Sequence, residues 1–361
     1  MTNTWLQYLG VFIASTALCM VLSPVAIVVA TRIGALDRPG GHKSHRSPVP
    51  YLGGVAIVIA FSGSVAAAAA LQPTDFILAV ESGRAELIIV LLLAIGLAIV
   101  GLADDLRNVS PAIRLMAEVL CAVQLWRMDA GITVSGEQTL DLFLTILWVV
   151  GITNAFNLLD NMDGLAAGQA AVCAMTMFAV AAANGQFLVA FLAIGLAGCA
   201  TGFLRTNFHP ARIYMGDGGA LYLGFLIAYL GIKLRFESSV LESFLVPVVA
   251  CAIPVLDTTL VTVSRVRSGR SPFQGGQDHI SHRLVKSGLP IPVAVGLTYV
   301  ATAVIGVLCF VISRVDPISA WILAILVAVT LVSAGILLSL VPVYPESRQR
   351  HFVIGERLNG D

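Results

Sequence analysis

Long, nearly continuous apolar stretches run through the chain and dominate what it can fold into. Their residues do not alternate with polar ones, as in a half-buried strand, so helices are favoured. A helix that crosses a bilayer needs about 20 mostly apolar residues, and lipid tolerates only helices or closed barrels. The first stretch has no preceding basic residue and is too long for a signal-peptide core, so we expect it to be retained. We predict an all-α, polytopic integral membrane protein.

The sequence predicts about 11 transmembrane helices. The fourth, fifth and eighth are short, and we expect them to extend into flanking polar residues. The predicted spans are Trp5–Ala30, Leu52–Leu71, Leu87–Ala103, Pro111–Trp126, Leu140–Thr153, Leu165–Ala183, Phe187–Leu204, Gly218–Leu234, Leu241–Val263, Ile291–Ile312 and Ile318–Val341.

Composition agrees with a protein whose solvent is largely lipid. Of the 361 residues, 58% are hydrophobic and 12% charged, against roughly 45–50% and about 25% in ordinary globular proteins. A secreted domain, a disordered scaffold and a cytosolic enzyme are therefore excluded. The formal net charge is zero, so nothing indicates a nucleic-acid partner. The six cysteines lie singly inside apolar runs, which indicates neither disulfides nor a zinc site.

Basic residues predict the orientation. With the N-terminus outside, 16 of the 21 Lys and Arg residues fall on one side of the membrane and 5 on the other. The positive-inside rule then places the larger set and the C-terminus in the cytoplasm. We predict one transmembrane domain over residues 1–343 and a cytoplasmic tail over residues 344–361. The predicted cytoplasmic loops are residues 32–51, 104–110, 154–164, 205–217 and 264–290.

The polar side chains collect in these five loops, which predicts one composite site at the inner membrane surface. Asp104 and Asp105 end the third span, where an inner loop usually carries Lys or Arg. Asp217 lies near the start of the eighth span, where a cation-bridged phosphate is favoured. Hard cations such as Mg²⁺ take carboxylate oxygens, so the three aspartates are candidate metal ligands. Solvated helix ends or simple caps are the alternative.

Four amide or carboxylate side chains recur at a spacing of three residues beside the fifth span: Asn154, Asn157, Asp160 and Asp163. On a helix, residues three apart are neighbours, so consecutive members can contact one bound group. Helix capping explains one or two such residues but not four in register. The pattern therefore favours ligand binding.

The last long loop carries His279, His282 and Arg283 after three further arginines. Imidazoles with Arg suit a diphosphate, which Arg grips with two hydrogen bonds. A two-histidine metal site is the alternative, but a third soft ligand is not evident. Asp257 lies inside the ninth span, where a charge is costly and indicates function, unless it makes a structural hydrogen bond.

The first loop contributes Asp37, Lys43 and His45. A basic cluster next to a membrane is often only an orientation signal, so this loop alone is a weak indication.

Together the motifs resemble the bacterial polyprenyl-phosphate N-acetylhexosamine-1-phosphate transferases, of the undecaprenyl-phosphate GlcNAc-1-phosphate transferase type. The resemblance runs in the family's order from Asp37 to Arg283, most of the chain. The matching segments are Asp37-Arg-Pro, His42-Lys43-Ser-His45, Pro48-Val-Pro50, Asp104-Asp105, Asn154 to Leu165, Asn207 to Asp217, Pro254-Val-Leu-Asp257-Thr and His279-Ile-Ser-His282-Arg283.

Two positions depart from the family pattern. Ser281 stands where many relatives have a middle histidine, and Asn161 stands where glycine is usual. The first departure removes any role for that histidine, and the second is expected to affect sugar selection.

The resemblance implies transfer of a sugar 1-phosphate, most readily GlcNAc-1-phosphate, from a UDP-sugar to undecaprenyl phosphate. The products are UMP and a lipid-linked diphosphosugar for cell-envelope polysaccharides such as O-antigen or cell wall. UDP-MurNAc-pentapeptide and modified UDP-HexNAc donors stay open. The resemblance also implies Mg²⁺ or Mn²⁺, a multi-pass location in the bacterial inner membrane with the site facing the cytoplasm, and a homodimer.

Residue roles follow from the resemblance. Asp217 is expected to be the principal metal ligand, with Asp104 and Asp105 near the metal and the lipid phosphate. The residues expected to neutralise the donor diphosphate or bind substrate from the basic loops are Lys43, His45, His279, His282 and Arg283. Those expected to hold nucleotide and sugar are Asn154, Asn157, Asp160, Asp163 and Asn207.

The aspartate pair is not expected to supply a strong base, because a phosphate monoester with a second pKa of about 6 is already largely dianionic at pH 7.

A secondary transporter is the leading non-enzyme alternative. Transporters place their sites near the bilayer midplane, often on repeated, broken helices. Here the polar residues collect in inner loops and no repeat is evident, so an enzyme is favoured.

Overall fold

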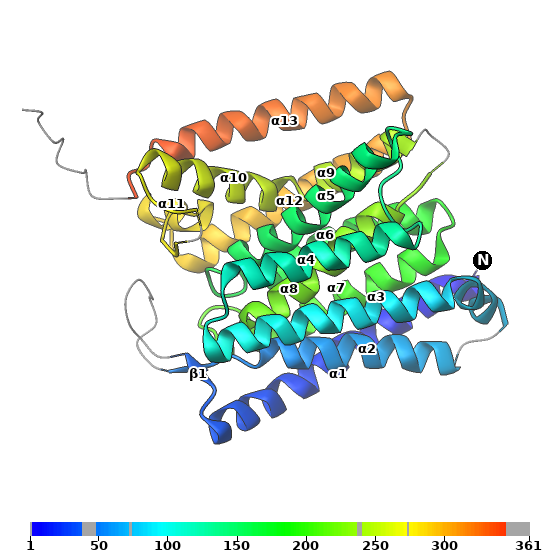
Figure 1. Cartoon of the computed structure of the whole chain (residues 1–361), viewed down its shortest axis with the longest axis horizontal. Helices are drawn as coiled ribbons and strands as arrows, with labels where there is room; N and C mark the ends of the chain where they lie inside the picture. The colour runs from blue at the N-terminus through cyan, green and yellow to red at the C-terminus, as the bar shows by residue number, and fades with distance from the viewer. Residues whose placement is uncertain (1, 38–47, 72–73, 237–239, 273, 344–361) are drawn as a thin grey trace, which may run out of the picture.

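The protein is a bundle of helices, described here from a computed structural model of residues 2–37, 48–71, 74–236, 240–272 and 274–343 (Figure 1). The elements are α1 (Thr2–Ile33), β1 (Leu36–Asp37), β2 (Val49–Pro50), α2 (Gly53–Leu71), α3 (Thr74–Arg107), α4 (Pro111–Arg127), α5 (Gln138–Leu159), α6 (Leu165–Ala183), α7 (Phe187–Asn207), α8 (Gly216–Lys233), α9 (Val240–Ala250), α10 (Ala252–Arg267), α11 (Ile280–Lys286), α12 (Ile291–Ile312) and α13 (Pro317–Ser339).

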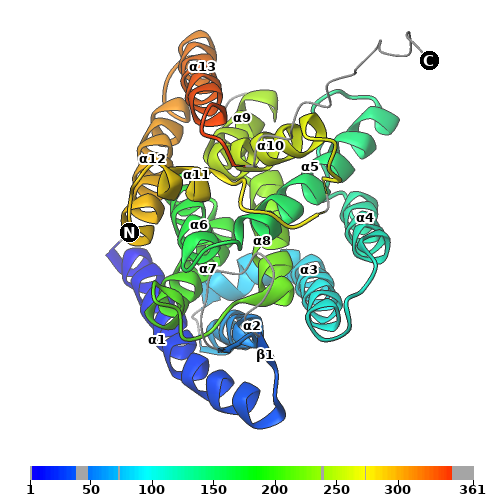
Figure 2. The same cartoon turned by 90° about the vertical axis from the view of Figure 1, so that its left-hand side faces the viewer.

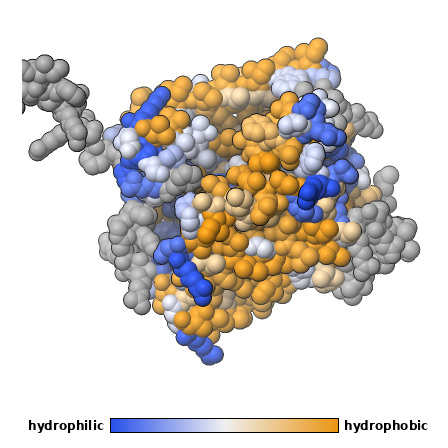
Figure 3. Space-filling view, in the orientation of Figure 1, coloured by the Kyte–Doolittle hydropathy of each residue, from blue (hydrophilic) through white to orange (hydrophobic). Residues whose placement is uncertain are grey.

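The prediction of an all-α polytopic membrane protein is confirmed. Seven of the described helices are long and apolar enough to cross a membrane: α1, α3, α5, α6, α7, α12 and α13. An eighth is added if the bent pair α9 and α10 forms one span. The other predicted spans are α2, α4 and α8, which are shorter or more polar, so the count of eleven stays a prediction. The surface in Figure 3 is apolar across the middle of the bundle and polar toward its ends.

The ninth predicted span is not one straight helix. It is broken at Cys251 into α9 and α10, which meet at an angle of 59°. Pro247 lies in α9 and Pro254 in the first turns of α10. A proline cannot donate to the helical ladder, and its ring crowds the preceding turn, so two prolines near one position explain the break.

α7 and α8 form the centre of the bundle, and nearly every residue of both is buried. Small residues let neighbouring backbones approach closely, as is usual between membrane helices. At Gly101 of α3, an added Cβ would lie 2.5 Å from the carbonyl carbon of Asp217 in α8. This contact brings the end of α3 against the start of α8.

Several helices continue into residues that the sequence analysis placed in loops. α3 runs to Arg107 and α5 to Leu159, so Asp104–Asp105 and Asn154–Asn157 are helical. The predicted loops 104–110 and 154–164 are therefore wider than the non-helical segments. Similarly, the ends of loops 205–217 and 264–290 belong to adjoining helices, and the latter contains α11. Hydropathy marks where lipid contact ends, whereas the helical hydrogen bonds persist beyond that point.

A short antiparallel pairing of β1 with β2 joins the first loop to the rest of the site. The carbonyl of Pro50 accepts a hydrogen bond from the N–H of Tyr214 at 2.7 Å, and the N–H of Gly54 donates to the carbonyl of Met215 at 2.8 Å. The residues that follow β2 are thus fixed beside the turn that leads into α8.

Candidate active site

The sequence motifs gather at one end of the bundle, at the left in Figure 1, and Figure 2 views this end directly. The C-terminal ends of α3, α5, α7 and α10 lie there with the N-terminal end of α8 and with α11. The prediction of one composite site drawn from distant loops agrees with this arrangement. Lys43 and His45 lie outside the described residues.

Arg114 of α4 joins two of the predicted metal ligands. Its Nη1 atom lies 2.6 Å from Asp104 Oδ2 and 2.5 Å from Asp217 Oδ2. The arginine side chain is 21% exposed, the Asp104 side chain 12% and the Asp217 side chain 32%, so the pair of carboxylates is open to solvent on the Asp217 side. One guanidinium nitrogen is therefore shared by two carboxyl groups that come from α3 and α8.

Asp105 holds the first turn of α8. Its Oδ1 accepts from the backbone N–H of Asp217 at 3.0 Å, and its Oδ2 accepts from the N–H of Gly218 at 3.4 Å. The first N–H groups of a helix have no partner within the helix, and a carboxylate is favoured there. Gly216 has a φ of +72°, and an added Cβ would lie 2.5 Å from Asp105 Oδ2. Only glycine fits this approach.

Asn154 of α5 faces α4. The Nδ2 of Asn154 donates to Glu118, which is fully buried, and to the carbonyl of Val150 at 2.9 Å. Glu118 Oε1 and Asn157 Oδ1 are buried with no hydrogen-bond partner among the described residues. Unsatisfied buried acceptors are rare in native proteins. Both atoms therefore mark places where a ligand hydroxyl or N–H group could donate.

Asp160 and Asp163 follow at the end of α5. Loss of contact with water, with the negative charges of Asp105 and Asp163, raises the pKa of Asp160 to about 7. Asp163 Oδ2 lies 2.7 Å from His209 Nδ1 and accepts from the N–H of Ala211 at 3.0 Å. Asp163 thereby fastens the α5–α6 turn to the segment between α7 and α8.

Asn207 is buried and also links the α5–α6 turn to the segment between α7 and α8. Its Oδ1 accepts from the N–H of Gly164 at 3.1 Å, and its Nδ2 donates to the carbonyl of Ile213 at 2.9 Å. The residue is 2% exposed. We expected Asn207 to hold nucleotide or sugar, but both polar atoms of its side chain already bond to the backbone.

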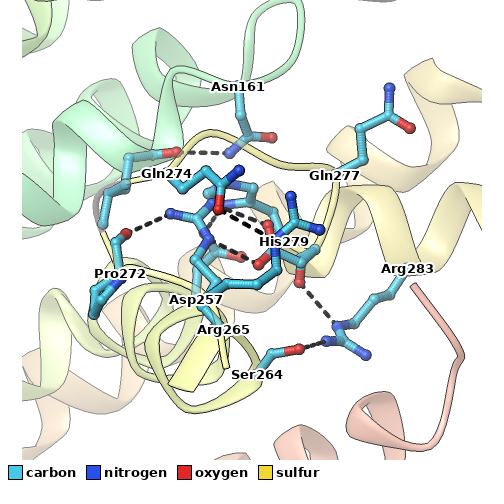
Figure 4. Close-up of polar contacts among 12 residues, drawn as sticks. Asn161, Asp257, Ser264, Arg265, Pro272, Gln274, Gln277, His279 and Arg283 are labelled. Carbon is cyan, nitrogen blue, oxygen red and sulfur yellow. Dashed lines mark hydrogen bonds and ion pairs between the residues drawn. The ribbon is translucent and has the colours of Figure 1, made fainter. Parts of the chain in front are cut away.

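The histidine motif rests on a buried charged network (Figure 4). Asp257 Oδ2 lies 2.7 Å from His279 Nδ1, and Asp257 Oδ1 accepts from the N–H of Ile280 at 2.6 Å. Arg265 forms two hydrogen bonds with Asp278, of 2.9 and 3.0 Å. All four charged or imidazole side chains are at most 3% exposed. This network thus offsets the free-energy cost of the Asp257 charge in the membrane. The same hydrogen bonds fix the start of α11.

His282 and Arg283 follow on α11 and face different surroundings. His282 is partly exposed, and burial together with the neighbouring His279 lowers its pKa to about 4. Arg283 was expected to neutralise the donor diphosphate, but it is 1% exposed. Its guanidinium donates to Ser264 Oγ at 3.0 Å and to the carbonyls of Leu338 and Val341 at 3.1 and 2.8 Å. Arg283 therefore fastens the end of α13.

The Asn/Asp segment and the histidine motif are in direct contact. Ser281 Oγ donates to Asn161 Oδ1 at 2.9 Å. On the side of α3 and α8, Asp160 lies near Asp105 and Gly216. The pKa of Asp160, raised mainly by burial, is raised further by the charge of Asp105 and lowered by a hydrogen bond from the backbone of Gly216. These contacts connect the motifs of α3, α5, α8 and α11 into one site. Asp37, at the end of β1, lies close enough to raise the pKa of Tyr51 and Tyr214.

Several participating residues were not assigned to the site from the sequence, among them Arg114, Glu118 and Arg265. The first was used only to predict orientation. Its spacing to Glu118 is four residues, which places both on one face of an otherwise apolar helix. Charged residues on such a helix are a functional signal, so this pair could have been found.

An apolar cavity with about 570 Å³ of space, part of it open to the surface, reaches the carboxylate cluster. α2 lines it with Val55 and Val58, and α3 lines it with Ile99, Leu102 and, at the polar end, Asp105. Ile99 is 61% exposed, so the cavity opens on the apolar outer surface. It could receive an apolar chain whose polar end stops at Asp105.

The carboxylates suit a hard divalent cation. Among the described residues, no three Asp, Glu, His or Cys side chains form a ready-made metal cage. Mg²⁺ usually takes one or two carboxylates together with substrate phosphates and water, and Asp104 and Asp217 already share one cationic partner. The donor set fits Mg²⁺ or Mn²⁺, whereas both Asp105 oxygens are engaged by α8.

Fold and site together define a polytopic membrane protein with a cluster of charged and polar side chains at one end of its helical bundle. Residues 87–235 match the family described as Glycosyl transferase family 4. A Bacillus subtilis protein named probable undecaprenyl-phosphate N-acetylglucosaminyl 1-phosphate transferase is 32% identical, over 80% of this chain and 80% of its own. The chain therefore belongs to glycosyl transferase family 4.

Two further relatives match more than two thirds of the chain. A decaprenyl-phosphate N-acetylglucosaminephosphotransferase of Mycobacterium tuberculosis is 30% identical, over 72% of this chain and 71% of its own. A phospho-N-acetylmuramoyl-pentapeptide-transferase of Bacillus velezensis is 31% identical, over 74% of this chain and 86% of its own.

Proposed function

We propose that the protein transfers GlcNAc-1-phosphate from UDP-GlcNAc to undecaprenyl phosphate, releasing UMP. The observation that carries this proposal is the Arg114-bridged pair of Asp104 and Asp217 beside Asp105, the residue at the polar end of an apolar cavity. This arrangement supports a charged reaction centre next to a site for a lipid chain. The names of the relatives from Bacillus subtilis and Mycobacterium tuberculosis support the donor and acceptor classes. UDP-MurNAc-pentapeptide is the second candidate donor, supported by the Bacillus velezensis relative.

In the proposed reaction, an oxygen of the lipid phosphate attacks the donor phosphorus that carries the sugar. The bond from that phosphorus to the bridging oxygen breaks, and UMP leaves with the electron pair. Both reactants are anions, so positioning and charge compensation are the main requirements. Arg114 supplies fixed positive charge, and Asp105 orients the α8 turn that carries Asp217. No protein base is needed, because the lipid phosphate is already largely dianionic at pH 7.

Asp104 and Asp217 are the residues that would hold Mg²⁺ or Mn²⁺, and the cation would supply charge compensation for the phosphates. Asn154 and Asn157 offer amide groups for nucleotide or sugar, next to the unpartnered Asn157 Oδ1. His282 presents a neutral imidazole at pH 7, since its pKa is about 4.

We also propose that the site faces the cytoplasm of a bacterial inner membrane. The excess of Lys and Arg on that side, 16 against 5, supports this orientation. The product would then feed a cell-envelope glycan. A homodimer stays a prediction, to be checked by the mass of the detergent-solubilised protein.

One assay tests the proposal. Purified protein is incubated with undecaprenyl phosphate, Mg²⁺ and each of several UDP-sugars, and UMP is measured. We expect UMP release that needs both the lipid and the metal and is fastest with UDP-GlcNAc. UMP release without lipid, or none with any UDP-sugar, would refute the transferase. Uptake of a UDP-sugar into vesicles without UMP release would support the transporter alternative instead.

A further inference from the structure

Asn161 and Ser281 form a hydrogen bond between two segments that are 120 residues apart. Ser281 is 1% exposed and lies on α11. Asn161 lies in the turn after α5, and Figure 4 shows its side chain directed toward the histidine loop. The Asn161 amide is held from both sides, because its Nδ2 donates to the carbonyl of Leu158 at 2.8 Å while its Oδ1 accepts from Ser281 at 2.9 Å. Its orientation is therefore fixed.

The neighbours of the two residues are the groups expected to contact the donor. Asn161 lies between Asp160 and Asp163, and Ser281 lies between His279 and His282. α11 has only seven residues. Asp257 accepts from the N–H of Ile280 at its start, and Arg283 donates to Ser264. Among the described residues, the hydrogen bond from Ser281 to Asn161 links α11 to the α5–α6 turn.

We propose that Asn161 and Ser281 act as a positioning pair that sets the place of His282 relative to Asp160 and so determines the affinity for the UDP-sugar. This inference rests on the proposed function. A misplacement of about 1 Å in a substrate-positioning group can cost a large factor in rate or affinity. Neither side chain is assigned a contact with the reacting phosphates, so neither is a catalytic residue.

The hydrogen bond needs both side chains. An alanine at 161 offers no oxygen to Ser281, and an alanine at 281 offers no donor to Asn161. We expect the pair to behave as one unit when it is changed.

The test is a double-mutant cycle on the full-length enzyme with Asn161→Ala, Ser281→Ala and both changes together. Each single variant is expected to raise the KM for UDP-GlcNAc about 3- to 10-fold, the range of one buried hydrogen bond, with kcat and the KM for undecaprenyl phosphate within about 2-fold. The double variant should match the single variants, because either change removes the whole contact. Ser281→Thr keeps the hydroxyl and should restore part of the donor affinity.

Ser287→Ala is the matched control, since Ser287 ends the same helix and its hydroxyl donates to the carbonyl of Arg283 at 3.0 Å. This control should leave the donor KM unchanged. Additive effects in the cycle, or single variants with unchanged donor KM, would overturn the inference.

A second measurement does not depend on the reaction. Hydrogen exchange over residues 280–286 should be faster in Asn161→Ala than in the wild type, because α11 loses its link to α5. The two proposals can therefore fail separately. Absence of UMP release by the wild type would refute the proposed function. Unchanged hydrogen exchange in Asn161→Ala would refute the positioning pair. Asn161 is partly exposed, so this variant is expected to fold.

Discussion

The Asp105 carboxylate accepts a hydrogen bond from the backbone N–H of Asp217 at 3.0 Å. One member of the aspartate pair on α3 therefore holds the helix end that carries the third aspartate, while Asp104 shares Arg114 with that aspartate. We propose separate tasks for these adjacent residues: Asp104 contributes charge to the reaction centre, and Asp105 holds the first turn of α8.

Replacing Asp105 separates these tasks. Asp105→Asn keeps an oxygen that can accept from α8, whereas Asp105→Ala leaves two backbone N–H groups without this partner. We expect Asp105→Ala to lower the unfolding free energy by about 1–2 kcal/mol, as when a helix cap is lost, and Asp105→Asn by less. The midpoint of thermal unfolding in detergent measures the difference. Equal losses in both variants would contradict the role of Asp105 in holding α8.

Arg114→Ala should lower kcat for UMP release about 10²- to 10³-fold, the usual cost of removing a preorganised group that stabilises transition-state charge. Arg114→Lys should recover only part of this rate, because an ammonium is a point charge without the planar geometry of a guanidinium. Arg127→Ala, at the other end of α4 and exposed, is the matched control and should keep full activity. A fully active Arg114→Ala enzyme would remove Arg114 from the reaction centre.

Asp104→Asn and Asp217→Asn should raise the Mg²⁺ concentration needed for half-maximal UMP release at least about 10-fold, because each removes one carboxylate from the proposed site. A chelator should abolish the wild-type activity, and added Mg²⁺ should restore it. If Asp104→Asn instead binds metal and both substrates normally and regains activity at high pH, Asp104 is a general base.

The stability of the protein should fall between pH 7 and pH 5 in a way that depends on His282. Its pKa is about 4 in the folded protein, against about 6.5 in an unfolded chain. The unfolded chain therefore binds the proton first as the pH falls, and folding is penalised progressively from pH 6.5 to pH 4. At pH 5 the penalty is about 1–2 kcal/mol. His282→Gln should lose less thermal stability than the wild type over this range, and equal losses would show that His282 is readily protonated.

Filling the apolar cavity should weaken binding of the lipid acceptor and leave binding of the donor unchanged. Val58→Trp places a large side chain where α2 lines the cavity, and we expect the KM for undecaprenyl phosphate to rise about 10-fold while the KM for UDP-GlcNAc is unchanged. Leu92→Trp is the control, because Leu92 is on α3, 61% exposed and not in the cavity lining. A rise in the donor KM instead would show that the cavity holds the nucleotide.

Most of the fold could be predicted because lipid imposes long apolar helices, and each predicted span lies on a helix or, for the ninth, on a bent pair of helices. The break at Cys251 was missed although Pro247 and Pro254 both signal it. The helical extension of α3 and α5 was missed because hydropathy reports lipid contact rather than backbone hydrogen bonding.

Many residues of the site could be predicted from the sequence, but the partner that each one contacts could not. Residue type and spacing indicate that Asn207, Asp257 and Arg283 matter, yet the partner of each comes from a distant segment and only the folded chain shows it. Asn207 bonds to backbone, and Arg283 to the end of α13. Arg114 was missed because a single basic residue near a membrane surface usually reports topology.

The hold of Arg283 on the final turn of α13 has a mechanical consequence. α13 is mostly exposed, with 17% of its apolar stretch buried in the bundle, and lipid-facing helices tilt when bilayer thickness changes. Its last carbonyls are nevertheless bound to a side chain on the same short helix as His282. A tilt of α13 would therefore be transmitted through Arg283 to the short helix that carries His282.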